Sequence, residues 1–402
     1  MIDMLSNLPD EVDVLVVGMG PGGSGAAKRC AELGLRVIGV EKRAEIGAPK
    51  RCGEAISRHG MTERIGIEPK GPWIVQEVHG AIVYAPNGTS IKVDYDGPEG
   101  WVVERKVFDK HLASLAAEAG ARVIAKTEAS GFRRENGRVK VTLKSGNESK
   151  EVTSKIIIAA DGVESKVARE MGINTFNKLP DICAGVQYEM AGIKHTGNMI
   201  EFFFGNDTAP GGYIWIFPKG RGVANVGIGI RKPWAKKTAL EYLDDFVQSR
   251  PELKDASIIE VNSGGVPVGG FLTDAVDDNL IVVGDAAHHV NPIHGGGIPE
   301  AYMAGRLAAE TASEALKARD FSKGFLKRYD KAWNDQRGTR LKKILKLREV
   351  IETMSDDDLN WLAEYLKGDD LVEFSRGGSG LVKLGKILMK KPRLIKLARK
   401  LL

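Results

Sequence analysis

The chain has few cysteines and no long apolar segment. Its three cysteines, Cys30, Cys52 and Cys183, are scattered over 402 residues. An odd and sparse set of this kind does not form a disulfide framework, so we expect free thiols in a reducing compartment. Met1–Glu11 lacks the basic start and apolar stretch of a signal peptide. No uninterrupted apolar run approaches the roughly 18 residues of a membrane-spanning helix.

Charge of one sign is in excess only at the end of the sequence. Lys383–Leu402 contains eight Lys or Arg and no acid; since the whole chain carries +5, the first 382 residues carry about −3. This balance gives no argument for binding nucleic acid. Leucines and isoleucines interleave the cations, and Pro392 divides the segment into two expected short helices. The segment suits an anionic membrane surface, or it packs on the protein with a solvated basic face.

A glycine motif follows the first apolar run. Val12–Val17 predicts a strand, Gly18–Gly23 fits G-x-G-x-x-G, and a helical pattern runs on to Leu33. A second predicted strand, Arg36–Val40, ends at Glu41. Such glycines permit a tight turn at a helix start, where backbone N–H groups bind a pyrophosphate, and an acid at the next strand end accepts hydrogen bonds from a ribose. The motif predicts a dinucleotide site.

Two distant segments also have an apolar strand that stops at an acid. They are Ile156–Asp161 and Leu280–Asp285, and the second leads into Gly295-Gly296-Gly297-Ile298. A carboxylate beside a glycine-started helix suits a ribityl chain and the electron-rich edge of a flavin. A domain that binds only NAD would not need this second site, so the pattern favours flavin adenine dinucleotide (FAD).

The remaining pattern predicts an α/β protein. A Rossmann-type FAD-binding domain (1–75, 100–180 and 272–330) is interleaved with an antiparallel-sheet substrate domain (76–99 and 181–271). Residues 331–402 form a helical C-terminal region, and residues 47–60 are expected to be a long functional loop. In Tyr213–Phe217 we expect Tyr213, Trp215 and Phe217 on one face of a strand, where they line a cavity for an apolar ligand or pack as ordinary core.

Several segments resemble the geranylgeranyl reductase family of flavoproteins, within the p-hydroxybenzoate-hydroxylase-like FAD superfamily. The similarity is greatest to archaeal members acting on digeranylgeranylglycerophospholipids. It extends to about residue 330, and the last seventy residues match only loosely. The segments that carry it are Glu41-Lys42-Arg43, Gly47–Glu54, Glu104–Asp109 and Pro210–Lys219.

This resemblance implies roles for individual residues. The residues implied to bind the cofactor are Gly18, Gly20, Gly23, Glu41, Cys52, Gly53, Ala55, Arg105, Ala129, Asp285, Gly297 and Ile298. Tyr213, Trp215 and Phe217 would contact substrate. An isolated double bond needs a proton as well as a hydride, and Cys52, Tyr213 or a water are the candidate donors. Adjacent His288 and His289 point in different directions and lack a carboxylate triad, so we expect no metal.

The implied activity is FAD-dependent saturation of C=C bonds in the geranylgeranyl chains of archaeal-type lipid precursors. The implied partners are an isoprenoid lipid, a membrane surface and a low-potential donor (ferredoxin, reduced deazaflavin or NAD(P)H), at the inner face of the cell membrane in the cytoplasm. The alternatives are a flavin monooxygenase, an electron-transfer flavoprotein that reduces a membrane quinone, and a flavin-binding regulator without turnover. Gly295-Gly296-Gly297 departs from the Gly-Gln-Gly of the aromatic hydroxylases, which counts against a monooxygenase.

Overall fold

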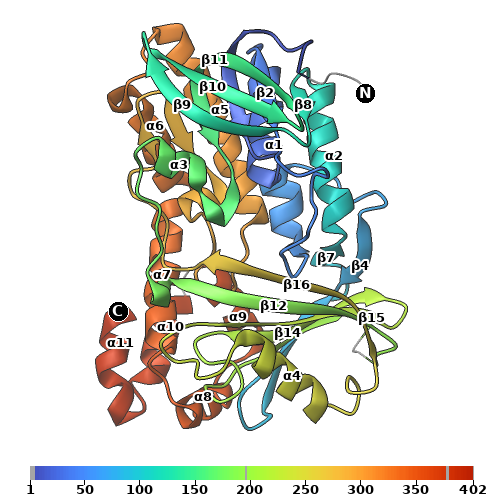
Figure 1. Ribbon diagram of the computed structural model, residues 1–402. Coiled ribbons are helices and arrows are strands. Elements are labelled where there is room, and N and C mark those ends of the chain that lie inside the picture. Colours follow the sequence, from blue (N-terminus) through green and yellow to red (C-terminus); the bar gives the residue numbers. More distant parts are fainter. Residues whose placement is uncertain (1–4, 195–196, 377–379, 402) are drawn as a thin grey trace.

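A computed structural model describes residues 5–194, 197–376 and 380–401. Met1–Met4, in the segment predicted to lack a signal peptide, and Leu402, the end of the basic segment, lie outside the described residues. Figure 1 shows one part built around a parallel sheet, a second part built around a broad, mostly antiparallel sheet, and C-terminal helices beside the second part.

The parallel sheet forms as the strand–turn–helix pattern predicts. Its strand order is β17-β18-β11-β1-β2-β8, and a β9–β10 hairpin joins the first half of the long strand β11. The strands are β1 (Glu11–Val17), β2 (Val37–Val40), β8 (Arg122–Ile124), β9 (Glu128–Glu135), β10 (Arg138–Ser145), β11 (Glu148–Ala159), β17 (Val276–Asp277) and β18 (Leu280–Val282). The sheet edge therefore brings together the chain near residues 18, 160 and 284.

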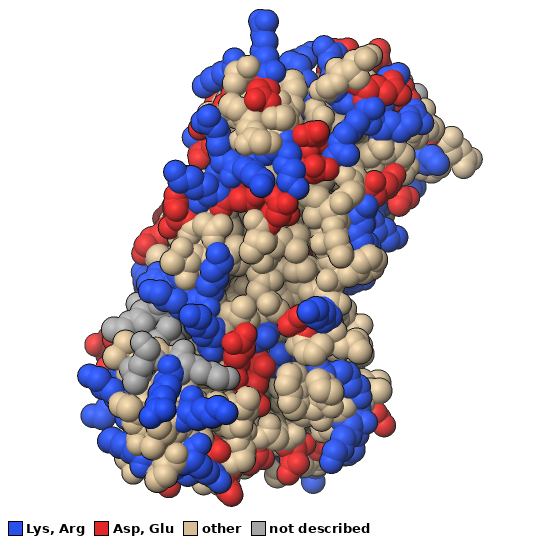
Figure 2. Space-filling view, turned by 90° about the vertical axis from the view of Figure 1, so that its left-hand side faces the viewer, with Lys and Arg blue, Asp and Glu red and all other residues tan. Residues whose placement is uncertain are grey.

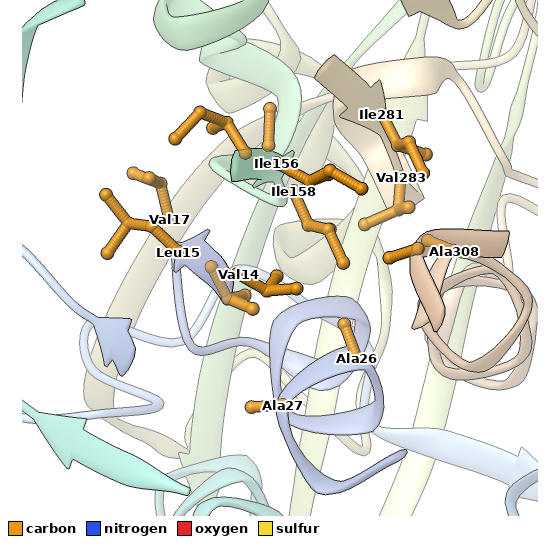
Figure 3. Packing of buried hydrophobic residues seen from close by; sticks show 14 of the residues in the cluster. Val14, Leu15, Val17, Ala26, Ala27, Ile156, Ile158, Ile281, Val283 and Ala308 are labelled. Carbon is orange, nitrogen blue, oxygen red and sulfur yellow. The ribbon is translucent and has the colours of Figure 1, made fainter. Parts of the chain in front are cut away.

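Helices α1 (Pro21–Glu32) and α5 (Ile298–Ala318) pack on this sheet and on each other. Figure 3 shows Ala26 and Ala27 of α1 and Ala308 of α5 among strand side chains such as Val14 and Ile158. The two helices approach closely, since a Cβ on Gly305 would lie 2.0 Å from the carbonyl oxygen of Gly22. Small residues thus fix the position of one helix against the other.

The second sheet has the order β16-β12-β15-β14-β13-β5-β6. Its strands are β5 (Gly80–Tyr84), β6 (Ser90–Asp94), β12 (Ile182–Ala191), β13 (Met199–Phe203), β14 (Tyr213–Gly220), β15 (Val223–Ile230) and β16 (Ser257–Pro267). The predicted antiparallel sheet is confirmed, with one parallel pair, β13 and β5. Helix α4 (Ala239–Ser249) covers one face, opposite the cavity described below.

The predicted loop 47–60 is wrong in its second half. A small sheet of β3 (Ala55–Ser57), β7 (Gly100–Val103) and β4 (Ile74–Val78) incorporates part of it, and a π-helix, η1 (His59–Ile65), follows. Helix α2 (Arg105–Glu118) leads from the small sheet back to the parallel sheet, and α3 (Lys166–Glu170) follows β11. The loop is therefore anchored at both ends by regular structure.

The C-terminal region is helical, as predicted. Helix α6 (Lys323–Trp333) still packs on the parallel sheet. The region that follows comprises the π-helix η5 (Asn334–Gly338), α7 (Thr339–Ile351), α8 (Asp356–Ala363), α9 (Gly368–Arg376), α10 (Gly380–Leu388) and α11 (Ile395–Leu401). The apolar side chains of the basic segment, including Leu384, Leu388 and Leu394, are buried against α7. They pack on the body of the protein instead of forming an apolar face toward a membrane. No described helix combines the length and apolar character that a membrane crossing requires.

Candidate active site

The glycine turn between β1 and α1 is shaped by close backbone contacts. Gly18 has φ +95°, and a Cβ on it would lie 2.4 Å from the carbonyl oxygen of Ala160. A Cβ on Gly23 would lie 1.7 Å from the carbonyl oxygen of Gly18, whereas a Cβ on Gly20 would meet nothing within 4 Å. Gly20 caps α1 without a side-chain hydrogen bond. The turn thus leaves open space at a helix start with free N–H donors, as a pyrophosphate requires.

Glu41 lies at the end of β2 beside this turn. Its carboxylate accepts hydrogen bonds from the backbone N–H of Met19 (3.1 Å) and of Arg43 (3.1 Å). These bonds fix the carboxylate at the wall of the cavity. Gly18 and Gly20 also line that wall. Gly23 is not among the described residues that line it, and this glycine instead allows close packing within the turn.

Two half-buried acids, Asp161 and Asp285, line the same cavity from the ends of β11 and β18. Burial raises the pKa of Asp285, and burial also raises the pKa of Asp161. Oδ1 of Asp161 is buried and has no hydrogen-bond partner in the described part of the chain. Buried acceptors of this kind need donors such as the hydroxyls of a ribityl chain. Gly297 caps α5 and lines the cavity, so a second helix start also faces the cavity. As a glycine, it has no side chain that could bind the N–H groups of this helix start.

The cavity wall between the two helix starts comes from the segment around Cys52. Cys52, Gly53 and Ala55 line the cavity with Arg105, whose guanidinium makes two hydrogen bonds to Asp109 (2.8 and 2.7 Å). Burial raises the pKa of the Cys52 thiol, although the Arg105 guanidinium opposes that shift. Cys52 is therefore a neutral thiol at pH 7. Ala129 in β9 lines the far side of the same cavity.

Strand β14 divides its side chains between two faces, as predicted. Tyr213, Trp215 and Phe217 line the cavity, while Ile214 and Ile216 are buried against the core under α4. The Tyr213 hydroxyl donates to the backbone oxygen of His294 (2.6 Å), and burial raises its pKa. The side chains of Tyr213, Trp215 and Phe217 together form an aromatic floor, which can bind an apolar ligand.

One cavity of about 920 Å³ joins the glycine turn to this aromatic floor. It lies toward the upper end of the range for ligand sites, which suits a large cofactor together with a second ligand. Figure 2 shows an uncharged band at the waist of the molecule, between parts rich in charge. The C-terminal helices complete the cavity through Leu347, Ile351, Leu359 and Leu371, which sequence reasoning did not find because no local motif marks them.

The histidines do not form a metal site in the described structure. His289 is fully buried and stacks on Trp333, with a ring-centroid distance of 3.8 Å. His294 lines the cavity. The carboxylates of Glu54, Glu104 and Glu189 do converge, but the ammonium of Lys219 lies among them. Sequence reasoning missed this cluster, since its members come from distant parts of the chain.

The fold and the site define a class of protein. A model of FAD-dependent oxidoreductases matches residues 13–177, and a model of the geranylgeranyl reductase catalytic domain matches residues 181–266. Together they cover most of both sheets, and the chain is an FAD-dependent oxidoreductase. Its glycines and the unpaired Oδ1 of Asp161 fit that cofactor.

Its relatives define the family more closely. Digeranylgeranylglycerophospholipid reductase of Methanocaldococcus jannaschii is 42% identical, over 99% of this chain and 100% of the relative. A second reductase of that name, from Methanopyrus kandleri, is also 42% identical, over 98% of this chain and 100% of the relative. The chain belongs to the geranylgeranyl reductase family. The matched length includes the C-terminal helices.

Solved structures agree with this assignment. A geranylgeranyl bacteriochlorophyll reductase-like protein from Thermoplasma acidophilum is 36% identical with a TM-score of 0.90, covering 98% of this chain and 100% of that one. The flavin-dependent brominase Bmp2 has a TM-score of 0.72 at 18% identity, covering 91% of this chain and 94% of that one. The second likeness concerns the fold alone.

Proposed function

We propose that this enzyme saturates C=C bonds in the geranylgeranyl chains of archaeal-type membrane lipid precursors, the 2,3-di-O-geranylgeranylglyceryl phospholipids. The observation that carries the proposal is the aromatic floor of Tyr213, Trp215 and Phe217 in a cavity continuous with the dinucleotide site. The names of the relatives point to the same lipid class. An apolar cavity of this kind suits a prenyl chain better than a small aromatic acid or a soluble electron acceptor.

We assign FAD to the residues around the two helix starts. Gly18 and Gly20 would bind the pyrophosphate, Glu41 the ribose, and Asp285 with Gly297 and Ile298 the ribityl–flavin end. Gly23 would not contact the cofactor but would allow the turn to pack closely against Gly18. Cys52, Gly53, Ala55, Arg105 and Ala129 complete the proposed cofactor wall. When bound, the flavin supplies a hydride from N5.

The protein's own groups orient the chain and hold the proton. Aromatic side chains on β14 would bind the apolar chain along one face and exclude water from the double bond. Both proposed proton donors, Cys52 and Tyr213, are protonated at neutral pH because burial raises the pKa of each. The Tyr213 proton already bonds to the backbone oxygen of His294, so the Cys52 thiol proton is the less committed of the two.

Anaerobic single-turnover reduction tests this function. Protein reduced with dithionite is mixed with digeranylgeranyl phospholipid, and the lipid should gain about 2 Da for each bond reduced, as one hydride plus one proton requires. A fully reduced flavin that leaves the lipid mass unchanged would contradict the proposal. Rapid oxidation by a quinone alone would then favour the electron-transfer alternative, and oxygen-coupled consumption of NADPH with an aromatic acid would favour a monooxygenase.

Attachment to the inner face of the cell membrane is part of the proposal. Because Leu384 and Leu388 of α10 are buried and Leu397 and Leu401 of α11 are half-buried, attachment would rest mainly on charge and a few exposed apolar groups. Lys386, Lys396 and Arg399 are exposed, as are Val382 (47%) and Met389 (44%). Each basic residue near an anionic surface contributes about 1 kcal/mol. A low-potential donor such as a ferredoxin, reduced deazaflavin or NAD(P)H would supply the electrons.

Flotation with vesicles tests the attachment. The double variant Lys386→Glu and Lys396→Glu changes exposed side chains only, whereas a truncation at Gly380 would remove Leu384 and Leu388 from the core. The wild-type protein should float with vesicles containing anionic lipid and not with zwitterionic ones, and the variant should float less. Equal flotation of both proteins would end the idea.

A further inference from the structure

A lysine at the end of the aromatic strand is enclosed by carboxylates from three separate segments. The ammonium of Lys219 lies 3.0 Å from Glu54, 2.8 Å from Glu104 and 2.9 Å from Glu189. Its side chain is 5% exposed. Glu54 belongs to the segment that contains Cys52, Glu104 caps α2, and Glu189 lies in β12. One ammonium therefore joins the flavin side of the cavity to the substrate sheet.

Glu54 is held in a backbone conformation that a non-glycine residue seldom adopts. Its φ is +74°, and it is fully buried. One carboxylate oxygen accepts from the backbone N–H of Arg105 (2.9 Å), and the other accepts from Asn225 (2.8 Å) as well as from Lys219 and Lys50. Such a conformation persists only where surrounding contacts determine it, and these contacts come mainly from charged and amide donors.

Side chains of the substrate sheet also hold the two residues before Glu54. Gln187 donates to the backbone oxygen of Cys52 (3.2 Å), and Asn225 donates to that of Gly53 (3.2 Å). Gln187 in turn accepts from the indole N–H of Trp215 (2.9 Å). A Cβ on Gly53 would lie 2.8 Å from the Phe217 ring. Gly53 thus packs directly against Phe217 of the aromatic floor.

Stability alone does not account for a buried cluster of this kind. Removing charges from water costs free energy, and apolar side chains of similar volume often stabilise a protein as well or better. The ion pairs among the four segments do fix the positions of these segments relative to one another. An active site requires such precise positioning. Lys50 extends the cluster, since its ammonium binds Glu54 and Glu189 in the same buried space.

We propose that Lys219 is a positioning residue for the reaction. By binding Glu54, Glu104 and Glu189 together, it holds Cys52 and Gly53 against Trp215 and Phe217 and so sets the distance between the flavin side and the substrate side of the cavity. The role of Lys219 in lipid reduction rests on the proposed function. The role of Lys219 in placing the Cys52 segment does not rest on that function, because the placement can be measured without any lipid.

Alkylation of Cys52 in the FAD-bound enzyme tests the placement. In Lys219→Met the segment should open more often, so Cys52 should react with iodoacetamide about tenfold faster, as expected when a charge-assisted contact is lost. Cys30, which is buried in helix α1, and Cys183 serve as references in the same molecule by mass spectrometry. The visible spectrum of the flavin should shift as well. Unchanged Cys52 reactivity with an unchanged spectrum would overturn the proposal.

Two further variants separate positioning from general destabilisation. Lys155→Met removes an ion pair of 2.8 Å to Asp13 in the parallel sheet; it should not raise Cys52 reactivity, and an equal rise there would contradict the proposal. If Lys219→Met does not fold, adding Glu104→Gln removes one uncompensated carboxylate. That double variant should still show fast Cys52 alkylation, and wild-type protection in it would also overturn the proposal.

Discussion

The two large sheets use their side chains in different ways. In the parallel sheet, β1 and the second half of β11 bury almost every side chain, and the proposed cofactor site consists of glycines, backbone and carboxylates beyond the strand ends. In the second sheet, neighbouring residues of β14 alternate between core and cavity. Stability and binding are thus separated by position along the chain in the first sheet, and by the face of a single strand in the second.

The largest expected effect tests this separation within the glycine turn. Gly23→Ala places a Cβ where the Gly18 oxygen already lies, so we expect a loss of stability of about 3 kcal/mol or more. Gly20→Ala meets no protein atom and should change stability by less than about 0.5 kcal/mol, yet weaken FAD binding. Denaturant unfolding of the apoprotein and FAD titration measure the two effects. A stable Gly23→Ala protein would refute the packing role of that glycine.

Substitutions at adjacent residues of β14 should likewise affect either stability or activity. Ile214→Ala opens a hole in the core and should cost about 2–5 kcal/mol of unfolding free energy. Trp215→Ala should cost less stability but lower kcat/KM for the lipid about tenfold or more, equivalent to at least ~1.4 kcal/mol of transition-state binding. Trp215→Phe, which keeps an aromatic face, is the control. If Ile214→Ala lowered kcat/KM as much as Trp215→Ala did, the division of faces would not hold.

The sequence predicted these features because their signals are local. The strand, the glycine turn, the helix and Glu41 lie within about thirty residues, and the alternation in Tyr213–Phe217 follows from strand geometry alone. The cluster around Lys219 has no such signal, since Glu54 is 165 residues away and Glu104 is 115. The wall formed by Leu347 and Ile351 is equally remote, because an apolar helix position has the same pattern whether it meets core or cavity.

A histidine in the core of the parallel-sheet part should make that part sensitive to acid. Burial, with a smaller effect of His288, lowers the pKa of His289 from 6.5 to about 3. Between pH 6.5 and pH 3, His289 is protonated in the unfolded chain but not in the folded chain. The free energy of unfolding therefore decreases as the pH is lowered through that range. At pH 5 the loss is about 2 kcal/mol. His289→Phe should reduce this loss, measured as unfolding free energy at pH 5 and pH 8; an identical pH dependence would contradict it.

The smallest expected effect concerns a surface pair beside the cofactor site. Hydrogen bonding to Lys42 lowers the pKa of Glu164 from 4.5 to about 2, against the opposite effect of burial, and Arg51 adds to the shift. The resulting stability is present above pH 4.5 and is lost as the pH falls toward 2. Since Glu164 is 37% exposed, Glu164→Gln should cost no more than about 1 kcal/mol at pH 7. Acid titration of both proteins would show the difference disappear at low pH, and a difference that persisted there would exclude the ion pair as its cause.

The contact of α1 with α5 through Gly22 and Gly305 has a consequence for cofactor choice. In the proposed placement of FAD, each helix would direct its first N–H groups at a different portion of the cofactor, and the close contact between the helices fixes the distance between those two portions. A ligand is therefore selected by its length as well as by its chemistry. Flavin mononucleotide, which lacks the adenylate half, would leave the ribose site at Glu41 unfilled and forgo its binding energy.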